Sequence, residues 1–435
     1  HEGERIFSST ESDVFNIEGS FAVDTKFIKT ADFYFRDTDY SLTEQHAEEA
    51  HEEEHEEEHE GHSEGPTLFK NDAKEYGLTL DLGSRAFSQK VAIKSSDEKM
   101  SIIGSEAFMN PSDSDEFSVG YYLSAPTELF HLDFGIRHDR VSRNGSVTHR
   151  EEEHHDEDEH EDEHEEAEID YFDRDINSTS YAFSVSNELN DFVSVNLGLS
   201  YLERAPSSVE LFMNGPHLAT GRYEVGNTSL ESEEANNIDL TLSYENNGFF
   251  GSLAFFRNNI DNYIYLLDET EEEHEEHEEH HEDLILSNYL QKDAEMDGYE
   301  LEFGRNFGFY QGELLVSFGF DSVSAEFTDG TNIPRIAPQR SVYTLAYTED
   351  DLKIRLSYKD VDDQDDIGAG ETATKGYEML DMRVTKIIDT GDGSLNLSVF
   401  GTNLLDEVAR NHTSFVKNEV PLAGRNYGVK FSYKF

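Results

Sequence analysis

Histidine and glutamate alternate in three segments of the sequence, and both side chains can bind metal ions. Residues 51–62 read HEEEHEEEHEGH, and similar runs occur at 149–164 and 274–281. Imidazole nitrogen and carboxylate oxygen both coordinate Zn²⁺, which takes about four ligands. Histidine is mostly neutral near pH 7, and dense carboxylates concentrate divalent cations around it. The candidate ligands in these segments are His51, His55, His59, His62, His154, His155, His160, His164, His274, His277, His280 and His281.

These low-complexity tracts span 44–64, 149–168 and 268–283, and they hold 35 of the 95 acidic residues and 14 of the 19 histidines. Repulsion among the glutamates opposes a helix, so we expect disorder without metal and several weak, interchangeable sites with it. The alternative is a set of solvated loops that only keep surfaces apart. The residue types do not select zinc over nickel or copper, because imidazole binds all three.

Composition excludes several other classes of protein. The 435 residues carry a net charge of −62, and the chain stays acidic outside the tracts, which argues against a nucleic-acid partner. No cysteine is present, so disulfides and cysteine-ligated zinc are excluded. No apolar run reaches the roughly 20 residues of a membrane-spanning helix, and no signal peptide is visible.

Catalytic motifs are missing, so we predict that the protein is not an enzyme. The sequence has no glycine-rich phosphate loop and no Gly-x-Ser-x-Gly elbow. His51-Glu52-Glu53-Glu54-His55 has the letters of a metalloprotease motif, but it lacks the apolar helix faces that the motif needs.

The tracts must be positioned by strands, because period-2 alternation dominates the rest of the chain. At the C-terminus Tyr427, Val429, Phe431, Tyr433 and Phe435 share one face. Strands are predicted at about 12–22, 26–38, 73–83, 87–96, 116–124, 128–142, 170–186, 191–203, 234–246, 249–266, 284–305, 311–325, 339–348, 351–363, 376–387, 394–403 and 425–435.

The connections between these 17 strands alternate between short and long. The long ones include 39–72, 97–115, 143–169, 204–233, 267–283 and 404–424. This segregation is typical of an all-β transmembrane antiparallel barrel with short periplasmic turns and long external loops. The first and last strands both run from the long-loop side to the short-turn side. A closed barrel with periplasmic termini has an even number of strands, so we expect an odd number of strands before His1.

Several runs of the sequence resemble a known family. The run ERAPSSVELFMNGPHLATGRYEVGNTSLESEEANNIDLTLSY (203–244) and the C-terminal FGTNLLDEVARNHTSF…PLAGRNYGVKFSYKF resemble TonB-dependent outer-membrane receptors. IGSEAFMNP (103–111), GPHLAT (215–220) and the tracts resemble the zinc-uptake (ZnuD-type) branch.

The resemblance implies a 22-stranded barrel around an N-terminal plug, with a TonB box that couples to the TonB–ExbB–ExbD complex. Residues 1–435 would then be a partial barrel that lacks the plug and five strands. It also implies a Gram-negative outer-membrane location with lipid around the wall, and import of a divalent metal, zinc above all.

The resemblance also selects two residues for a discrete metal site, Glu106 in GSEAF and His217 in GPHLAT. The alternative roles are a salt-bridge partner for Glu106 and a packing residue for His217. His412 is a weaker candidate, and we expect His131 and His138 on the predicted strand 128–142 to be structural.

Three other functions stay open. A receptor for a siderophore or another metal chelate uses the same architecture. A passive porin-like channel explains the barrel but not the motifs at 203–244. A soluble acidic metal buffer predicts a protein that needs neither detergent nor lipid.

Overall fold

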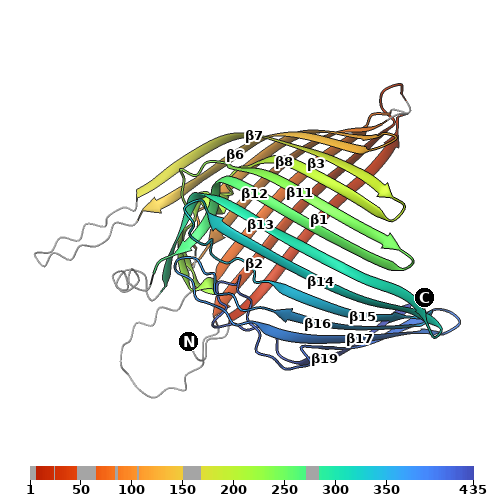
Figure 1. Ribbon diagram of the computed structural model, residues 1–435. Coiled ribbons are helices and arrows are strands. Elements are labelled where there is room, and N and C mark those ends of the chain that lie inside the picture. Colours follow the sequence, from red (N-terminus) through yellow and green to blue (C-terminus); the bar gives the residue numbers. More distant parts are fainter. Residues whose placement is uncertain are drawn as a thin grey trace, which may run out of the picture.

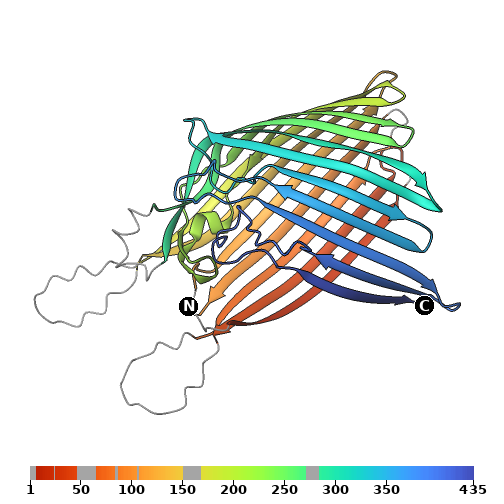
Figure 2. The ribbon, with the colours of Figure 1, turned by 60° about the horizontal axis from the view of Figure 1, so that its bottom comes forward.

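The protein is described by a computed structural model, which defines residues 6–23, 25–46, 65–83, 87–104, 107–149, 168–270 and 284–435. These residues form 19 strands, one short α-helix and one 3₁₀ turn. All strands except β9 (Asn214–His217) and β10 (Arg222–Val225) build one antiparallel wall, which leaves 17 wall strands. The wall curves into a barrel (Figures 1 and 2), so the predicted fold class is confirmed.

The wall strands follow one another in chain order, and β8 pairs with β11 across the connection that holds the two small strands. Their bounds are β1 (Ile6–Ala22), β2 (Thr30–His46), β3 (Thr67–Asp81), β4 (Ser88–Ile103), β5 (Ser112–Pro126), β6 (His131–His149), β7 (Glu168–Asn190), β8 (Val193–Arg204), β11 (Glu233–Asn246), β12 (Phe249–Asp268), β13 (Ile285–Phe309), β14 (Gly312–Phe327), β15 (Arg340–Thr348), β16 (Leu352–Val361), β17 (Tyr377–Asp389), β18 (Ser394–Thr402) and β19 (Asn426–Lys434). Each corresponds to one predicted strand. Within the described residues, β1 and β19 do not pair with each other.

The connections segregate by length as predicted. Short turns such as 191–192 and 247–248 gather at one end of the barrel, at the right in Figure 1. Long connections such as 205–232 and 403–425 gather at the other end, which we call the long-loop end. β1 begins at the long-loop end and β19 finishes at the short-turn end, in the direction that the sequence predicted.

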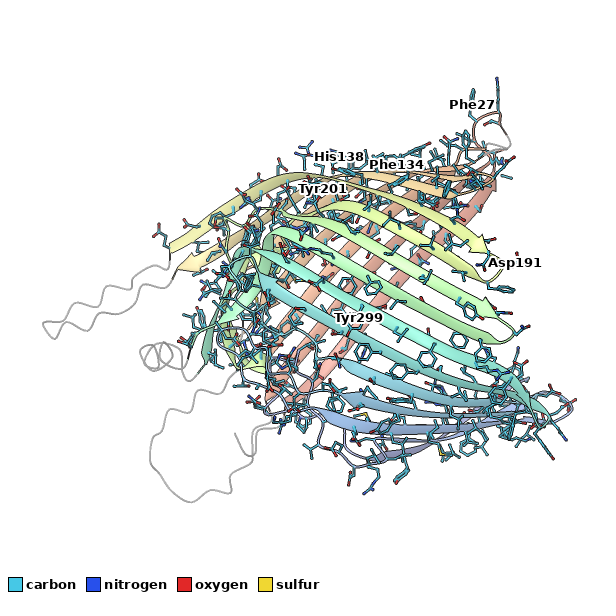
Figure 3. All side chains as sticks on the ribbon, viewed as in Figure 1. Phe27, Phe134, His138, Asp191, Tyr201 and Tyr299 are labelled. Atoms are coloured by element: carbon cyan, nitrogen blue, oxygen red, sulfur yellow. The ribbon has the colours of Figure 1, made fainter. Side chains whose placement is uncertain are left out.

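Alternation along the strands gives the wall an apolar outer face. Leu199 pairs with Ile238 and Leu197 with Leu240, and all four side chains are 40–51% exposed. The register continues this face across the wall to Phe134 and Tyr299, which are labelled in Figure 3. A row of exposed apolar side chains costs free energy in water, so this band requires an apolar surrounding.

The inner face of the wall is polar. Ser118 donates to Asp139 at 2.5 Å, and Arg137 pairs with the same carboxylate at 2.7 Å. Arg143 pairs with Glu116 at 2.5 Å on the same two strands, β6 and β5. Buried polar groups of this kind are stable because they are hydrogen-bonded to one another.

Several strands extend further toward the long-loop end than the sequence predicted. β2 continues to His46 rather than 38, and β6 continues to His149 rather than 142. In these extensions polar residues predominate and apolar ones such as Tyr40 and Val147 are few, so the alternation that marks a strand weakens while the backbone pairing continues. The predicted long loops 39–72 and 143–169 are therefore partly strand.

Packed apolar residues lie at the long-loop end rather than along the barrel axis. One cluster contains Ile102, Met109, Leu211, Phe212, Leu230 and Ile264. It fills the space between the wall and the 205–232 connection, whose α1 (Ser208–Phe212) lies among the loops in Figure 2. No helix among the described residues has both the length and the apolar character needed to cross a membrane.

Candidate functional site

Of the ligands predicted in the tracts and in the discrete site, His217 alone lies among the described residues. The tract histidines and Glu106 all lie outside them. The candidate site is therefore built outward from His217.

His217 forms a hydrogen-bonded pair with Glu224 on a small hairpin. β9 and β10 pair antiparallel, with His217 opposite Arg222, and η1 (Leu218–Thr220) connects them. Nδ1 of His217 lies 2.7 Å from Oε1 of Glu224. A carboxylate accepts hydrogen bonds, so Nδ1–H of His217 donates, and in the neutral imidazole the lone pair is then on Nε2. Thr220 also donates to Oε1 of Glu224, at 3.1 Å.

The surroundings of the pair favour a cation at His217. The Glu224 side chain is 5% exposed and that of His217 is 30% exposed. A buried carboxylate is costly unless a positive or hydrogen-bonding partner compensates it. A carboxylate that fixes the imidazole through one nitrogen, and leaves the other nitrogen accessible, is a common arrangement around protein-bound metals.

Local sequence explains why the hairpin forms. Gly221 has φ 65°, in the left-handed region that glycine adopts without a steric penalty, and it lets the chain turn into β10. β10 then pairs in parallel with the start of β13, from Arg222 opposite Ile285 to Val225 opposite Asn288. The hairpin is thereby joined to the barrel wall.

The helix that precedes the hairpin is fixed by a capping box. Ser207 accepts from the Glu210 backbone N–H at 3.2 Å, and the Glu210 side chain accepts from the Ser207 backbone N–H at 2.7 Å. Arg204 pairs with Glu210 at 2.9 Å and with Glu233 at 2.5 Å. The Arg-Ala-Pro-Ser motif of the sequence therefore has a structural role: it holds the connection against β11.

The segment that follows Glu106 lies directly against His217. The Phe108 and His217 rings are 4.7 Å apart, and Asn214 donates its backbone N–H to the Phe108 carbonyl at 2.8 Å. A Cβ at Gly215 would lie 2.7 Å from Cα of Phe108, so this close approach requires glycine. The two motifs that the sequence singled out, GSEAF and GPHLAT, thus converge.

His217 and Glu224 line a cavity of ≈ 760 Å³ at the long-loop end. Most of its other lining residues are apolar or aromatic: Tyr40, Phe69, Met100, Ile102, Phe108, Met109, Val209, Met213, Leu266, Tyr289 and Phe415. Glu224 is the one acidic residue among the described residues that line it. The cavity is large enough for an ion with several ligands or for a small organic molecule.

A second feature, which the sequence analysis missed, is a set of buried charged residues that joins the long loops. Arg222 of β10 makes two hydrogen bonds to Asp268, at 2.9 and 2.7 Å, and both side chains are buried. Ser287 donates to Asp268 at 2.8 Å. Arg335 lies 3.5 Å from Asp268, and both guanidinium groups lie over the Phe415 ring, at 4.3 and 4.6 Å. We call Arg222, Asp268, Arg335 and Phe415 the arginine cluster.

Next to the arginine cluster, Glu371 organises the loop between β16 and β17. It accepts backbone N–H groups of Arg335 and Gly368 at 3.0 and 3.1 Å. His412 Nε2 lies 3.1 Å and Lys417 Nζ lies 3.7 Å from its carboxylate. Burial raises the pKa of Glu371, but the adjacent His412 side chain and the two backbone hydrogen bonds outweigh it and lower the pKa overall. Burial also lowers the pKa of Lys417, against the effect of Glu371.

Three further histidines of the described residues, His412, His131 and His138, have hydroxyl groups as hydrogen-bond partners. His412, the weaker candidate ligand, is 1% exposed and lies 2.8 Å from the Thr374 hydroxyl. On β6, His131 Nε2 lies 2.8 Å from the Ser124 hydroxyl, and His138 Nδ1 lies 2.9 Å from that of Thr179. These contacts agree with the structural role that was predicted for His131 and His138.

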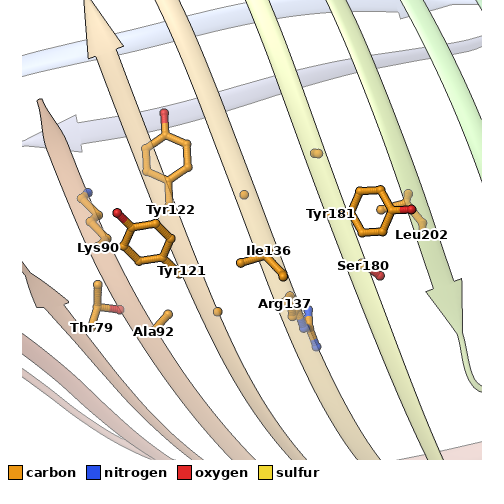
Figure 4. A pocket seen from close by; sticks show the side chains of 13 residues that line it. Thr79, Lys90, Ala92, Tyr121, Tyr122, Ile136, Arg137, Ser180, Tyr181 and Leu202 are labelled. Carbon is orange, nitrogen blue, oxygen red and sulfur yellow. The ribbon is translucent and has the colours of Figure 1, made fainter.

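A further cavity of ≈ 440 Å³ lies in the wall across β3 to β8 (Figure 4). Gly120 and Gly135 leave room beside Tyr122, Lys90 and Arg137. Neither His217 nor any other predicted ligand lines this cavity.

Within the described ranges, no group of three or more His, Cys, Asp or Glu side chains is arranged to hold a metal ion. His217 and Glu224 supply one free nitrogen and one carboxylate that orients it. A complete site at this place therefore needs further ligands beside His217.

The sequence matches the family described as "TonB dependent receptor-like, beta-barrel" over residues 7–433. The match covers nearly the whole chain, and the chain belongs to this family of receptor barrels.

Solved structures share the fold at low sequence identity. The copper transporter OprC is similar with a TM-score of 0.73 and 14% identity, over 98% of this chain and 65% of that one. The FrpB iron transporter from Neisseria meningitidis (F3-3 variant) gives 0.68 and 14%, over 98% and 63%. The Serratia marcescens hemophore receptor HasR, in complex with its hemophore HasA and heme, gives 0.65 and 12%, over 97% and 65%. The chain thus spans about 65% of the length of these structures.

Proposed function

We propose that this chain is the barrel of a Gram-negative outer-membrane receptor that imports a divalent metal ion, zinc in the first place. One observation carries the proposal: a histidine with a free Nε2 is held by a buried carboxylate at the long-loop end of a receptor barrel. This is the chemistry of a metal-binding imidazole.

Two further features support the metal site. Phe108 packs on His217, so Glu106, two residues earlier in the chain, is the natural source of a second ligand. The three His/Glu tracts connect strands at this same end and would gather cations near it. In this proposal the tract histidines bind weakly and exchange their metal, while His217 and Glu106 belong to the tighter site.

Transport across the membrane rests on family membership. TonB-dependent receptors draw energy from the TonB–ExbB–ExbD complex, and the exposed apolar outer face of the wall suits surrounding lipid. The solved relatives carry copper, iron or heme by their titles, which supports metal cargo without selecting zinc.

The test is calorimetric titration of Zn²⁺ into the full-length receptor in detergent, with Ni²⁺ and Cu²⁺ as competitors. We expect one tight site that is lost in Glu106→Ala/His217→Ala and retained in His131→Ala, the matched histidine control on the wall. A tight site that persists in the double variant would overturn the assignment of these ligands.

A second function, uptake of a metal chelate such as a siderophore, is supported by the size and lining of the cavity. At ≈ 760 Å³, with Phe69, Phe108, Tyr289 and Phe415 in its wall, it suits an organic ligand as well as an ion. Failure of the intact receptor to bind any free metal ion would favour this function.

A further inference from the structure

Beyond a divalent ion, we propose that the cavity beside His217 holds a site for a soft monovalent metal ion, Cu(I), with methionine sulfurs as ligands. The inference rests on the proposed metal-uptake function and on His217 as a ligand. It assigns a role as metal ligands to Met100, Met109 and Met213, which the proposed zinc site does not use.

Methionine is concentrated at this place in the molecule. The chain has six methionines, and three of them are among the 18 residues that line the cavity. They come from three separate segments: Met100 from β4, Met109 from the connection after it, and Met213 from the residue that follows α1. Separate segments that bring the same rare residue to one cavity point to a common role.

The backbone brings two of the sulfurs within reach of one another. Met109 and Met213 are opposite partners in an isolated antiparallel bridge. Opposite partners in such a bridge have Cβ atoms roughly 4.5–5.5 Å apart, on the same side of the pair. Met213 directly precedes β9, whose last residue is His217. The Met213 thioether and the imidazole therefore lie on one short segment, and Met109 lies on the segment that pairs with it.

The ligand set selects the metal. Thioether sulfur is a soft ligand that favours Cu(I) and is a poor ligand for hard divalent ions, whereas imidazole serves both. Three thioethers and the free Nε2 of His217 make four donors. They complete a coordination sphere that the nitrogen and oxygen ligands among the described residues leave incomplete.

Charge balance points the same way. The cavity wall is largely apolar, and its described lining residues include one acidic side chain, Glu224, and one basic side chain, Lys70. An ion that loses its water in such surroundings is costly in proportion to its uncompensated charge. Because the charges of Glu224 and Lys70 offset each other, a monovalent ion leaves one uncompensated positive charge in the described lining and a divalent ion leaves two.

The test measures Cu(I) affinity of the full-length receptor in detergent, without oxygen and with ascorbate, by competition with bicinchoninate. The variants are Met100→Leu, Met213→Leu and the double variant, since leucine keeps volume and apolarity but removes sulfur. Met296→Leu is the control, because Met296 packs against the separate cluster around Ala294 and Phe327. Zinc titration and a thermal melt are run on each protein.

We expect the double variant to lose Cu(I) affinity by more than about 10-fold, with zinc binding and the melting temperature close to those of the Met296→Leu control. X-ray absorption should show copper–sulfur scattering that decreases in the variants. Unchanged Cu(I) affinity in the double variant would overturn the sulfur site and leave the zinc proposal standing. If His217→Ala binds both Cu(I) and Zn²⁺ as tightly as the parent protein, the proposed function itself would be contradicted.

Discussion

At the scale of single residues, the candidate site depends on the orientation of one imidazole. The Glu224 carboxylate holds His217 through Nδ1, and Thr220 holds the carboxylate in turn. The pairing of His217 with Glu224 could not be read from the sequence, because Glu224 lies seven positions further along the chain and no periodicity connects the two residues. The pairing exists only because the β9–β10 hairpin forms.

Glu224→Gln tests this orientation. Glutamine keeps the size of the side chain but presents an amide that can turn its NH₂ group toward Nδ1, which favours the wrong imidazole tautomer. We expect zinc affinity to decrease by about 10- to 100-fold, measured by calorimetry. Glu245→Gln, at the short-turn end of β11, is the matched control and should bind as the parent does. Equal affinity of the two variants would show that Glu224 does not position His217.

At the scale of elements, the strands were predictable and the small elements were not. All 17 wall strands were visible from alternation, since one face of each is apolar over most of its length. α1, β9 and β10 have only five, four and four residues, too few for any period to appear. The sequence placed Asp268 in an acidic tract, whereas in the structure it ends β12 as the buried partner of Arg222. The pairing could not be predicted, because the arginine lies 46 residues away in the sequence.

Arg222→Met tests whether the arginine cluster holds β10 in place. The substitution leaves the buried Asp268 carboxylate with a weaker partner, Arg335 at 3.5 Å. Breaking a buried ion pair costs about 3–5 kcal/mol, and we expect the lower end because Arg335 and Ser287 remain. Arg222 also donates to the Phe415 carbonyl and lies over its ring, so proteolysis and hydrogen exchange of residues 403–425 should become faster in the variant. Arg222→Met/Asp268→Leu should restore part of the protection, because no carboxylate stays buried without Arg222, although Arg335 also loses its contact with Asp268. No recovery at all would contradict the ion-pair explanation.

Acid should loosen the same loops through Glu371. Its pKa in the folded protein is lowered from 4.5, so the unfolded chain binds more protons in the interval between the two values. Its contribution to stability is therefore complete above about pH 4.5 and is lost as the pH falls through the folded value. His412 and Lys417 face the carboxylate from the β18–β19 loop, and Arg335 faces it from the β14–β15 loop.

Hydrogen exchange of the 362–376 loop at pH 6.5 and pH 4 checks this prediction. We expect Glu371→Gln to exchange faster than the parent protein at pH 6.5 and to differ less from it at pH 4. Asp366→Asn, at an exposed position of the same loop, serves as the control substitution. A difference between parent and Glu371→Gln that grows toward acid would contradict the assigned direction of the pKa.

At the scale of the whole molecule, the barrel separates two kinds of residue at its long-loop end. The hairpin with His217 is joined to the wall through β13, whereas the His/Glu tracts occupy connections between strands. If His217 is a ligand, we expect the hairpin to set the dissociation rate of the ion and the tracts to set its rate of capture. Dense carboxylates raise the association rate of a cation by about 10- to 1000-fold, and salt suppresses the effect.

Replacement of residues 47–64, 150–167 and 271–283 by short Asn-Gly turns tests this division, since it removes the tracts, retains Asp268 and leaves each flanking strand pair a turn that can close it. We expect the association rate of Zn²⁺ at low salt to fall about 10-fold or more, with little change in the dissociation rate. The intact receptor should lose the same advantage at high salt, where exposed charges are screened over short distances. Stopped-flow measurements with a zinc-sensitive dye give both rates. A faster dissociation in the replacement variant would mean that the tracts supply ligands to the tight site itself, because the loss of charge at a distance changes how often an ion arrives and not how long it stays.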